Sequence, residues 1–442
     1  MTRRQLLARV SMGFPGLALS SLLGAPPHRA GKAKNVLFLF MPGGVSHMDT
    51  FDPKPKLKQV SGELSGQGKR KWHGSPWSFK QYGQAGLWVS ELFPHITEVV
   101  DELAVIRSMV SEFPLHARGN IFLHTGRNIG GFPSLGSWIT YGLGSENRNL
   151  PGYVLLRDEY VPPGGLENFS NGFLPATHQA THLKGDDPPV DNIVPADAPT
   201  RQQTKLETIL AQDTAFAKGN GGDDAVESAI RNYEMAYRMQ SLVPDVLELA
   251  KESEATKKLY GLDSEDKYKR LYGLQCLRAR RLLESGVRFV EVTSPNIFGM
   301  NGTWDQHSDL KKGHETNARV TDQAVTALIK DLRARGLLDE TLVLWAGEFG
   351  RTPDTANGDG RDHHPACFTL WMAGAGVKKG AIYGATDELG NKVAENPVTI
   401  HDLHATMLHQ LGVDHRRLTY RFGGRDVSLT DVHGRVVTEV LG

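Results

Sequence analysis

The chain has 442 residues, of which 39% are hydrophobic and 8% aromatic, so it can bury one large core or two ordinary ones as a soluble globular protein. Lys plus Arg equals Asp plus Glu at 50 each, a balance that gives no indication of a nucleic acid or an acidic membrane as partner. Cys276 and Cys367 lie far apart and form no CxxC motif, so neither a thiolate metal cluster nor a disulfide framework is indicated.

The N-terminus carries a twin-arginine export signature. Arg3 and Arg4 precede a weakly apolar run that ends in small residues around Ala25. The run is too short and too rich in Gly and Ser for a stable membrane span, and an amphipathic surface helix is the alternative. We therefore expect residues 1–30 to be a signal peptide, and the mature chain to be exported to the periplasm or the cell exterior.

The first strand is expected at residues 35–41. This unbroken apolar run is typical of a central parallel strand that is covered on both faces. Gly43 and Gly44 follow it, and His47 and Asp49 come directly afterwards, within reach of the strand end. The sequence thus places the first ligand-type side chains where a strand stops.

The next elements alternate between helix and strand. Residues 93–103 predict a helix and residues 104–109 a short strand. A turn at His116 leads into a second helix, which Gly126 closes. Small and polar groups at such a helix start can hold an anion on free backbone amides.

The amino-acid composition changes twice in the middle of the chain. Residues 150–215 are rich in Pro, Gly, Asn and Asp, with a short strand candidate at 153–156. Residues 223–285 are charged and helical, and we expect them to be scaffold or lid without chemistry. Gly286 then caps the last helix before a strand at 287–292, which forms the second half of a βαβ unit.

A second polar group follows that strand. Asp305 and His307 come first, and His314 further along is a rival to His307. A helix over residues 316–335 then leads to the apolar strand at 342–346.

A third polar group follows the strand at 342–346. Glu348 lies on a turn bracketed by glycines, and His363 and His364 come after a polar loop. Open α/β sheets place ligands beyond the carboxyl ends of their strands, and three such ends here carry carboxylates or imidazoles. A hard or borderline divalent cation, such as zinc, manganese or calcium, requires such side chains. An exposed loop whose histidines are neighbours by chance is the alternative.

Toward the C-terminus, residues 368–373 predict a further strand and residues 399–412 a helix, with Thr399 as its N-cap. His401 and His404 share one face of that helix. We expect them to be satisfied polar positions on a helix that packs against the sheet, and metal ligation is the alternative.

These motifs resemble those of the DUF1501 family, a sulfatase-like branch of the alkaline phosphatase superfamily. The resemblance rests on the twin-arginine start and on residues 40–44, 46–55, 304–307, 347–353, 361–365 and 429–434, which span nearly the whole mature chain. It implies a mostly parallel central sheet flanked by helices. We accordingly expect residues 31–442 to form a single sulfatase-like α/β domain, with a helical insertion at about 223–285.

The resemblance also implies a site for one or two divalent metal ions at the strand ends. There the ions polarise a phosphate or sulfate ester and activate an alkoxide nucleophile. The residues that match ligand positions are Asp49, Asp305, His307, Glu348, His363 and His364.

The chain departs from the superfamily pattern in the first and third groups. Gly43 and Gly44 replace the aspartate expected directly after the first strand, so Asp49 must reach back from a loop. Phe349 replaces a histidine beside Glu348, which removes one nitrogen ligand.

The nucleophile position also departs from the pattern. Residues 123–127 resemble the end of the sulfatase signature, whose modified cysteine or serine falls at His116, where this chain has no Cys, Ser or Thr. We therefore take His116 and Arg127 as candidate catalytic residues, with His116 or a metal-bound hydroxide as the attacking group.

Two functions from different classes follow. The first is a metal-dependent hydrolase of sulfate or phosphate esters, acting on a small molecule or a polysaccharide. The second is an exported, catalytically inactive protein that keeps the fold and binds a carbohydrate or a protein partner. The sequence shows no P-loop and no dinucleotide-binding turn, and no region requires a nucleic acid or a membrane span in the mature chain.

Overall fold

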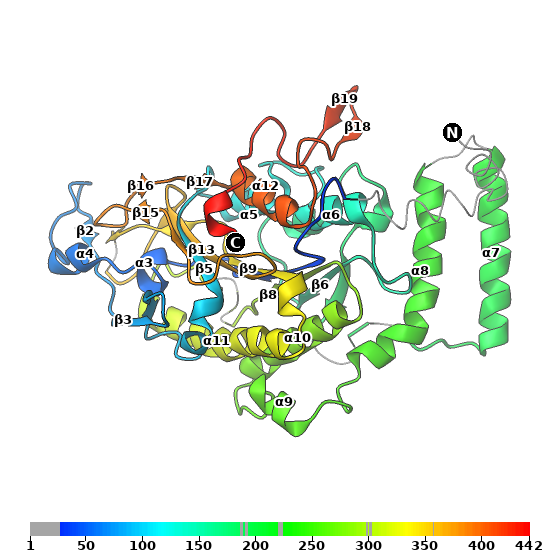
Figure 1. The fold of residues 1–442 in the computed structure, drawn as a ribbon, viewed down its shortest axis with the longest axis horizontal. Helices are drawn as coiled ribbons and strands as arrows, with labels where there is room; N and C mark the ends of the chain where they lie inside the picture. The colour runs from blue at the N-terminus through cyan, green and yellow to red at the C-terminus, as the bar shows by residue number, and fades with distance from the viewer. Residues whose placement is uncertain are drawn as a thin grey trace.

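The computed structural model describes residues 27–185, 189–190, 193–219, 224–297, 299, 303–356 and 358–442. The twin-arginine motif and most of the predicted signal peptide lie outside these residues. The core is a nine-stranded sheet between two layers of helices (Figure 1). In spatial order its strands are β14 (Ile382–Tyr383), β5 (Leu103–Val110), β13 (Phe368–Gly374), β9 (Thr341–Ala346), β1 (Asn35–Phe40), β8 (Phe289–Thr293), β6 (Tyr153–Arg157) and β7 (Thr181–Lys184), and β17 (Val398–Thr399) also pairs with β5.

The central strand β1 shows why the sheet is covered on both faces. All six of its residues are buried, and successive side chains of a strand point to opposite faces. Leu37 and Leu39 belong to the core cluster that includes α10 (Lys267–Glu284) and α11 (Leu310–Ala334). Phe38 and Phe40 belong to the opposite cluster, with α5 (His116–Thr125), α6 (Leu135–Leu143) and α12 (Ile400–Gln410). The unbroken apolar run is thus explained by burial on both sides.

The predicted mostly parallel sheet flanked by helices is confirmed. β1 pairs in parallel with β8 and β9, and β6 pairs in parallel with β8 and β7, whereas β13 runs antiparallel to β9 and β5. The carboxyl ends of β1, β8 and β9 therefore lie at one edge of the sheet, as predicted. β5 runs in the same direction, because it is antiparallel to β13, and so the chain that leads from β5 to α5 leaves from that edge too.

Two predicted helices differ from the observed ones. The chain over 93–103 forms two short turns, η1 (Ile96–Glu98) and η2 (Val100–Glu102), instead of one helix. The buried Asp322 carboxylate of α11 accepts the backbone N–H groups of His95 and Ile96 at 2.6 and 2.9 Å, so a tertiary contact fixes this turn. The helix predicted to begin at residue 316 begins earlier, at Leu310, which places His314 inside α11.

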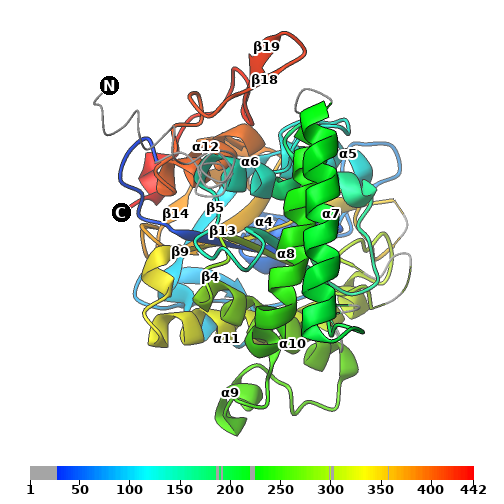
Figure 2. The ribbon, with the colours of Figure 1, turned by 90° about the vertical axis from the view of Figure 1, so that its right-hand side faces the viewer.

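The helical region in the middle of the chain begins earlier than the predicted residue 223. α7 (Pro199–Gly219) and α8 (Asp224–Leu247) lie side by side at one end of the molecule, beyond the layered core (Figures 1 and 2). α9 (Glu254–Leu259) follows them, and α10 returns to the layer under the sheet.

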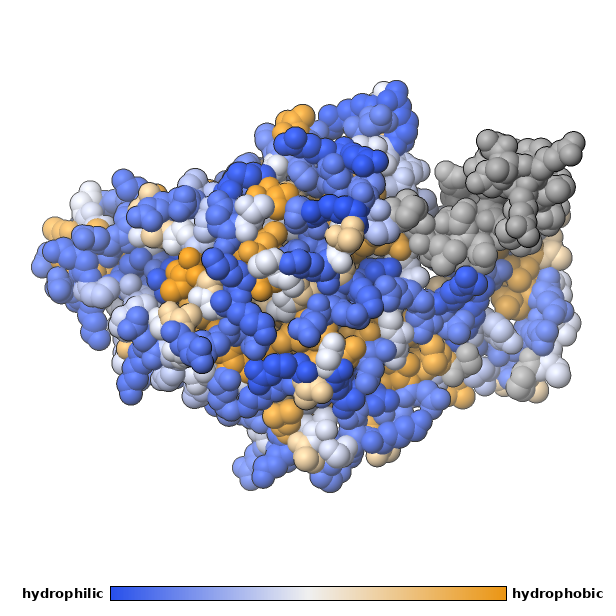
Figure 3. All heavy atoms as spheres, in the orientation of Figure 1, coloured by the Kyte–Doolittle hydropathy of each residue, from blue (hydrophilic) through white to orange (hydrophobic). Residues whose placement is uncertain are grey.

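Small elements complete the fold around these layers. They are α3 (His47–Thr50), α4 (Pro55–Gln59), β2 (Lys71–Trp72), β3 (Phe79–Tyr82), β4 (Leu87–Ser90), η3 (Gly165–Phe169), η4 (Ala176–His178), η5 (Leu338–Glu340), β10 (Gly350–Arg351), β11 (Asp354–Thr355), β12 (His363–His364), β15 (Ala385–Thr386), β16 (Val393–Glu395), β18 (Tyr420–Phe422), β19 (Arg425–Val427) and η6 (Thr438–Val440). The face drawn in Figure 3 is mainly hydrophilic, with small apolar areas between the polar ones. None of the helices within the described ranges is both long and apolar enough to cross a membrane.

The turn after β1 yields the first testable prediction. Gly43 has φ +112°, and a Cβ there would lie 2.6 Å from the Thr303 hydroxyl oxygen and 2.7 Å from two backbone nitrogens. Gly62 has φ +92° but open space around it. An alanine there would have the backbone strain without the steric clash, so Gly62 is the control position. We expect Gly43→Ala to lower the free energy of unfolding by at least about 2 kcal/mol more than Gly62→Ala does. Urea denaturation of the two variants measures this difference, and equal losses would contradict the packing described for this turn.

Candidate metal centre

Five ligand-type side chains meet at the edge of the sheet where β1, β5, β8 and β9 end. Asp305 and His307 follow β8, Glu348 follows β9, His363 lies on the short strand β12, and His116 begins α5. Four of them are predicted metal ligands, and His116 is a predicted catalytic residue. The structure therefore brings together residues that are far apart in the sequence.

His307 and His363 face each other across the centre. Their Nε2 atoms lie 2.9 Å apart, and each lies 3.2 Å from Oδ1 of Asp305. Nδ1 of His307 lies 3.0 Å from the Asp362 carboxylate, and Nδ1 of His363 lies 2.6 Å from the Pro114 carbonyl oxygen. Each Nδ1 thus has an oxygen acceptor, and the two Nε2 atoms face each other beside Oδ1 of Asp305. Two imidazole nitrogens at this distance need a proton or a cation between them.

Asp305 links the two halves of the centre. Its Oδ1 faces His307 and His363 and accepts from the Arg351 guanidinium, whereas its Oδ2 lies 3.2 Å from Nε2 of His116. Although burial raises its pKa, hydrogen bonds from His116 and His363 hold the pKa of Asp305 well below its usual range. This carboxylate is therefore ionised, as a metal ligand must be.

His116 lies between two carboxylates. Its Nδ1 is 2.6 Å from Oε1 of Glu348, and its Nε2 faces Asp305. Burial lowers the pKa of His116, but hydrogen bonds to Asp305 and Glu348 outweigh this effect and raise it to about 9. Without a metal ion, His116 is therefore an imidazolium at neutral pH.

Glu348 is fully buried and held by the glycine turn after β1. It accepts the backbone N–H of Gly43 at 3.0 Å and that of Gly44 at 3.3 Å. These backbone donors belong to Gly43 and Gly44, the positions where the resemblance given above implied an aspartate. Glu348 is therefore a partner of His116 and of the backbone, and it does not face the His307–His363 pair.

The donor set fits a divalent cation. His116, Asp305 and His363 each offer a ligand atom, and these atoms lie within 4.8 Å of one another. His116 is the member of this group that its raised pKa keeps protonated, and His307 supplies another imidazole nitrogen next to Asp305 and His363. Imidazole nitrogens combined with a carboxylate oxygen are typical of zinc sites, and Nδ1 contacts to carboxylate or carbonyl oxygens are the usual outer support of such ligands.

Three predicted site residues lie elsewhere. Both oxygens of Asp49 pair with Arg361, at 2.7 and 3.2 Å, so this carboxylate already has its cation. Nε2 of His364 lies 2.6 Å from the carbonyl oxygen of Asn391. Neighbouring residues of a strand point to opposite faces, so His363 and His364 of β12 cannot both reach the centre.

Arg127 is the third predicted site residue that lies outside the centre. It follows the C-terminal end of α5, about 15 Å along the helix from His116. Its guanidinium pairs with Asp431 at 2.8 Å and lies over the ring of Phe132. The structure thus gives Arg127 no contact with the centre.

His314 does not compete with His307 for this position. It is fully buried in α11, where it stacks on Trp77 with the ring centroids 5.6 Å apart and meets Trp304 edge-on at 5.2 Å. Of the two rivals, His307 is therefore the one in the centre.

Two buried arginines were not predicted. Arg351 donates to the carbonyl oxygens of Gly43, Gly44 and Arg361 and to Asp305. Arg361 pairs with Asp49, as described above. The sequence signal for them was their place in the motifs over 347–353 and 361–365, on which the family resemblance rests.

The centre opens toward solvent beside His307. The His307 side chain is 46% exposed, whereas those of His116, Asp305 and His363 are 16–18% exposed. A cavity of about 210 Å³ adjoins it, lined by residues 305–309, Lys312 and Gly313. A ligand can thus approach along the start of α11.

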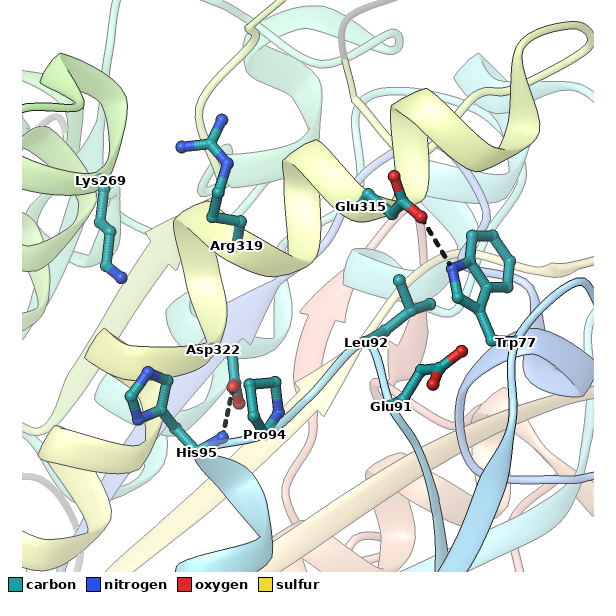
Figure 4. Close-up of a pocket in the computed structure, with 9 residues that line it drawn as sticks. All are labelled: Trp77, Glu91, Leu92, Pro94, His95, Lys269, Glu315, Arg319 and Asp322. Carbon is teal, nitrogen blue, oxygen red and sulfur yellow. Dashed lines mark hydrogen bonds between the residues drawn. The ribbon is translucent and has the colours of Figure 1, made fainter.

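A separate cavity of about 300 Å³ lies between α11 and residues 91–95 (Figure 4). Two of its carboxylates have partners within the protein: Asp322 holds the turn at His95, and Glu315 accepts from the Trp77 indole at 3.3 Å. None of the predicted site residues lines it.

Comparisons with known proteins place the chain in context. A family model described as "Protein of unknown function (DUF1501)" matches residues 33–441. A protein in the alkaline phosphatase superfamily from Vibrio parahaemolyticus has a TM-score of 0.41 at 12% identity, covering 100% of this chain and 80% of that chain. The PsFucS1 sulfatase from Pseudoalteromonas sp. has a TM-score of 0.38 at 12% identity, covering 93% and 72%. The phosphonate monoester hydrolase SpPMH from Silicibacter pomeroyi has a TM-score of 0.40 at 11% identity, covering 92% and 76%. No curated protein matches the sequence.

The position of His116 predicts a pH-dependent stability of the metal-free protein. Its pKa is raised to about 9 in the folded state, so its contribution is complete below its ordinary pKa and is lost as the pH rises through about 9. We expect the free energy of unfolding in chelator to fall by up to about 3 kcal/mol between pH 6.5 and 9.5. This fall should be absent in His116→Gln and present in the control His95→Gln. Denaturant titrations across this range measure it, and a His116 imidazole NMR signal titrating below pH 7 would contradict it.

Proposed function

Because the chain belongs to DUF1501, a family of proteins of unknown function, we propose a function from its own site: a metal-dependent hydrolase of sulfate or phosphate esters, sulfatase-like in fold. The observation that carries this proposal is the convergence of two imidazole Nε2 atoms on one carboxylate oxygen. His307, His363 and Asp305 supply these atoms within 3.2 Å of one another. Such an arrangement is costly in a protein unless a cation or a shared proton occupies it.

Asp305, His307 and His363 would hold the ion. Zinc suits two imidazoles and a carboxylate best, and manganese and calcium, which prefer oxygen ligands, suit them less well. A divalent ion bound there supplies a Lewis acid that polarises an ester oxygen and lowers the pKa of water.

His116 is placed to move a proton. Both of its nitrogens face carboxylates, so it has no free lone pair, and this favours a proton donor over the attacking group that the sequence suggested. Glu348 holds Nδ1 and thereby fixes the ring, while Nε2 lies at the Asp305 side of the centre. From there its proton can pass to the oxygen of a leaving group.

The remaining groups orient and admit the substrate. Arg351 is buried and fixes Asp305 through its guanidinium, so the carboxylate keeps both oxygens in place. The cavity beside His307 provides the approach for a small-molecule or polysaccharide ester.

A catalytically inactive protein that binds a carbohydrate or a protein partner is the second candidate. The observation in its favour is that residue 116 is a histidine, where sulfatase-like chemistry requires an alkoxide. In either case we propose export to the periplasm or the cell exterior, which is supported by the twin-arginine motif.

Metal binding gives the most direct test. We expect the protein, purified without chelator or affinity metal, to carry about one equivalent of a divalent ion per chain. His363→Ala should weaken zinc affinity by about 100-fold or more, because it removes a direct ligand. The adjacent His364→Ala is a matched control and should bind zinc as the wild type does. Elemental analysis and zinc titration measure both, and a wild type that neither carries nor binds a divalent ion would rule out the hydrolase.

Activity separates the two candidate functions. Metal-loaded protein should hydrolyse aryl sulfate or aryl phosphate probes, and His116→Gln should lower kcat by about 100- to 10,000-fold through loss of the proton donor. His364→Ala should retain the activity. Turnover assays on p-nitrophenyl sulfate and p-nitrophenyl phosphate measure this. A fully loaded protein without activity on a broad panel of such esters would favour the binding protein.

A further inference from the structure

The β18–β19 hairpin is a projection of the molecule that has no part in the metal centre. Its two strands pair antiparallel, and it stands out from the layered core beyond α12 (Figures 1 and 2). All residues over 421–426 are exposed. The chain then returns to Leu429, whose carbonyl oxygen lies 2.7 Å from the place of a Cβ at Gly126. Gly126 ends α5, so the hairpin joins the body at the end of this helix that lies about 15 Å from His116.

The segment that forms the hairpin, residues 415–427, is basic, although the chain as a whole is balanced in charge. Its single acidic residue is Asp426, and its four exposed arginines are Arg416, Arg417, Arg421 and Arg425. The Arg421 guanidinium lies 3.3 Å from the Asp426 carboxylate. The side chains of the other three arginines form no hydrogen bond and no ion pair within the described residues. Three guanidinium groups can therefore pair with the oxyanions of a ligand.

An aromatic ring lies among these charges. Phe422 is 48% exposed, and its ring stacks on Phe173 with the centroids 4.4 Å apart and the planes at 16°. Tyr420 also stacks on Phe173, at 5.8 Å, and supports the same side of the hairpin. Phe422 and Arg425 are directly opposite each other in the register, so their side chains share one face. The exposed part of the Phe422 ring is thus held in place beside a guanidinium.

Exposed arginines around a fixed aromatic ring suit a polymer whose units carry both a flat ring and anionic groups. Acidic polysaccharides and nucleic acids both have these features, and the predicted export of the chain favours the polysaccharide. We propose that the β18–β19 hairpin binds a sulfated polysaccharide. The arginines pair with its sulfate groups, and Phe422 packs against the face of a sugar ring.

This inference rests on the proposed function, in which the metal centre hydrolyses esters of such a polymer. The hairpin holds one part of the polysaccharide while another part occupies the centre. Attachment at a second place raises the effective concentration of the polymer at the centre. The hairpin therefore selects polymeric esters over small ones.

Binding of dextran sulfate, with unsubstituted dextran as the neutral probe, tests the role of the arginines. The hairpin variant carries Arg416→Gln, Arg417→Gln and Arg425→Gln. We expect it to raise the Kd for dextran sulfate about 10-fold or more, because three pairs with sulfate are lost. The control variant removes the same charge from exposed positions on α7, α10 and α11 and should bind as the wild type does; it carries Arg201→Gln, Arg270→Gln and Arg319→Gln. Calorimetry measures binding, and thermal unfolding shows that each variant is folded.

The aromatic contact has its own test. Phe422→Ala should raise the Kd for dextran sulfate about threefold or more, and Phe422→Tyr should keep the affinity of the wild type. His363→Ala should also bind dextran sulfate as the wild type does, because the hairpin is remote from the metal centre. Hydrolysis of p-nitrophenyl sulfate should be unchanged in the hairpin variant.

Each of the other outcomes decides the proposal. A wild type that does not bind dextran sulfate, or an equal loss in the hairpin and control variants, would overturn it. Loss of binding in His363→Ala would place the polymer at the metal centre and overturn it too. Single-stranded oligothymidine that binds as tightly, and is weakened by the same variants, would make the hairpin a nucleic-acid surface.

Failure of this inference is distinguishable from failure of the proposed function. Binding of dextran sulfate through the hairpin without any ester hydrolysis would uphold the hairpin site and reject the hydrolase. Hydrolysis of p-nitrophenyl sulfate by a protein that does not bind the polymer would reject the hairpin site and leave the hydrolase in place.

Discussion

The structure depends on neutralising the charge of three carboxylates that are buried at one edge of the sheet. Asp49 and Glu348 are fully buried and Asp305 nearly so, and an uncompensated buried charge costs several kcal/mol, on the order of 3–5. A different set of groups neutralises each carboxylate. Arg361 pairs with Asp49, glycine amides and His116 surround Glu348, and Arg351 and imidazoles surround Asp305. These contacts fix the positions of the β1 turn, the β10–β12 hairpin and α5 relative to one another.

The glycines at 43 and 44 and the phenylalanine at 349 have a physical basis in the packing of the site. Gly44 leaves room for the Phe349 ring, since a Cβ there would lie 2.7 Å from it. That ring packs against the imidazoles of His116 and His363, with centroids 5.0 and 4.8 Å away. Phenylalanine at this position thus supplies no ligand but provides an apolar wall that orients two histidines. The Phe349 ring therefore requires a glycine at residue 44.

The strands and the location of the site could be predicted from the sequence, whereas the membership of the site could be predicted only in part. Apolar runs that end in glycine mark β1 and β9, and parallel pairing then fixes a common edge. Local sequence patterns do not show which residues far apart in the chain contact each other. They could not show that Arg361 takes Asp49, that strand geometry turns His364 away, or that Asp322 replaces a predicted helix by two turns.

The two-residue strand β12 has a consequence for how this loop can change over evolution. Register pairs Gly350 with His364 and Arg351 with His363, and side chains alternate between the two faces. A deletion or insertion of one residue in the loop over 352–361 shifts this register by one step and presents the wrong histidine. Changes in loop length are therefore expected to be constrained by parity.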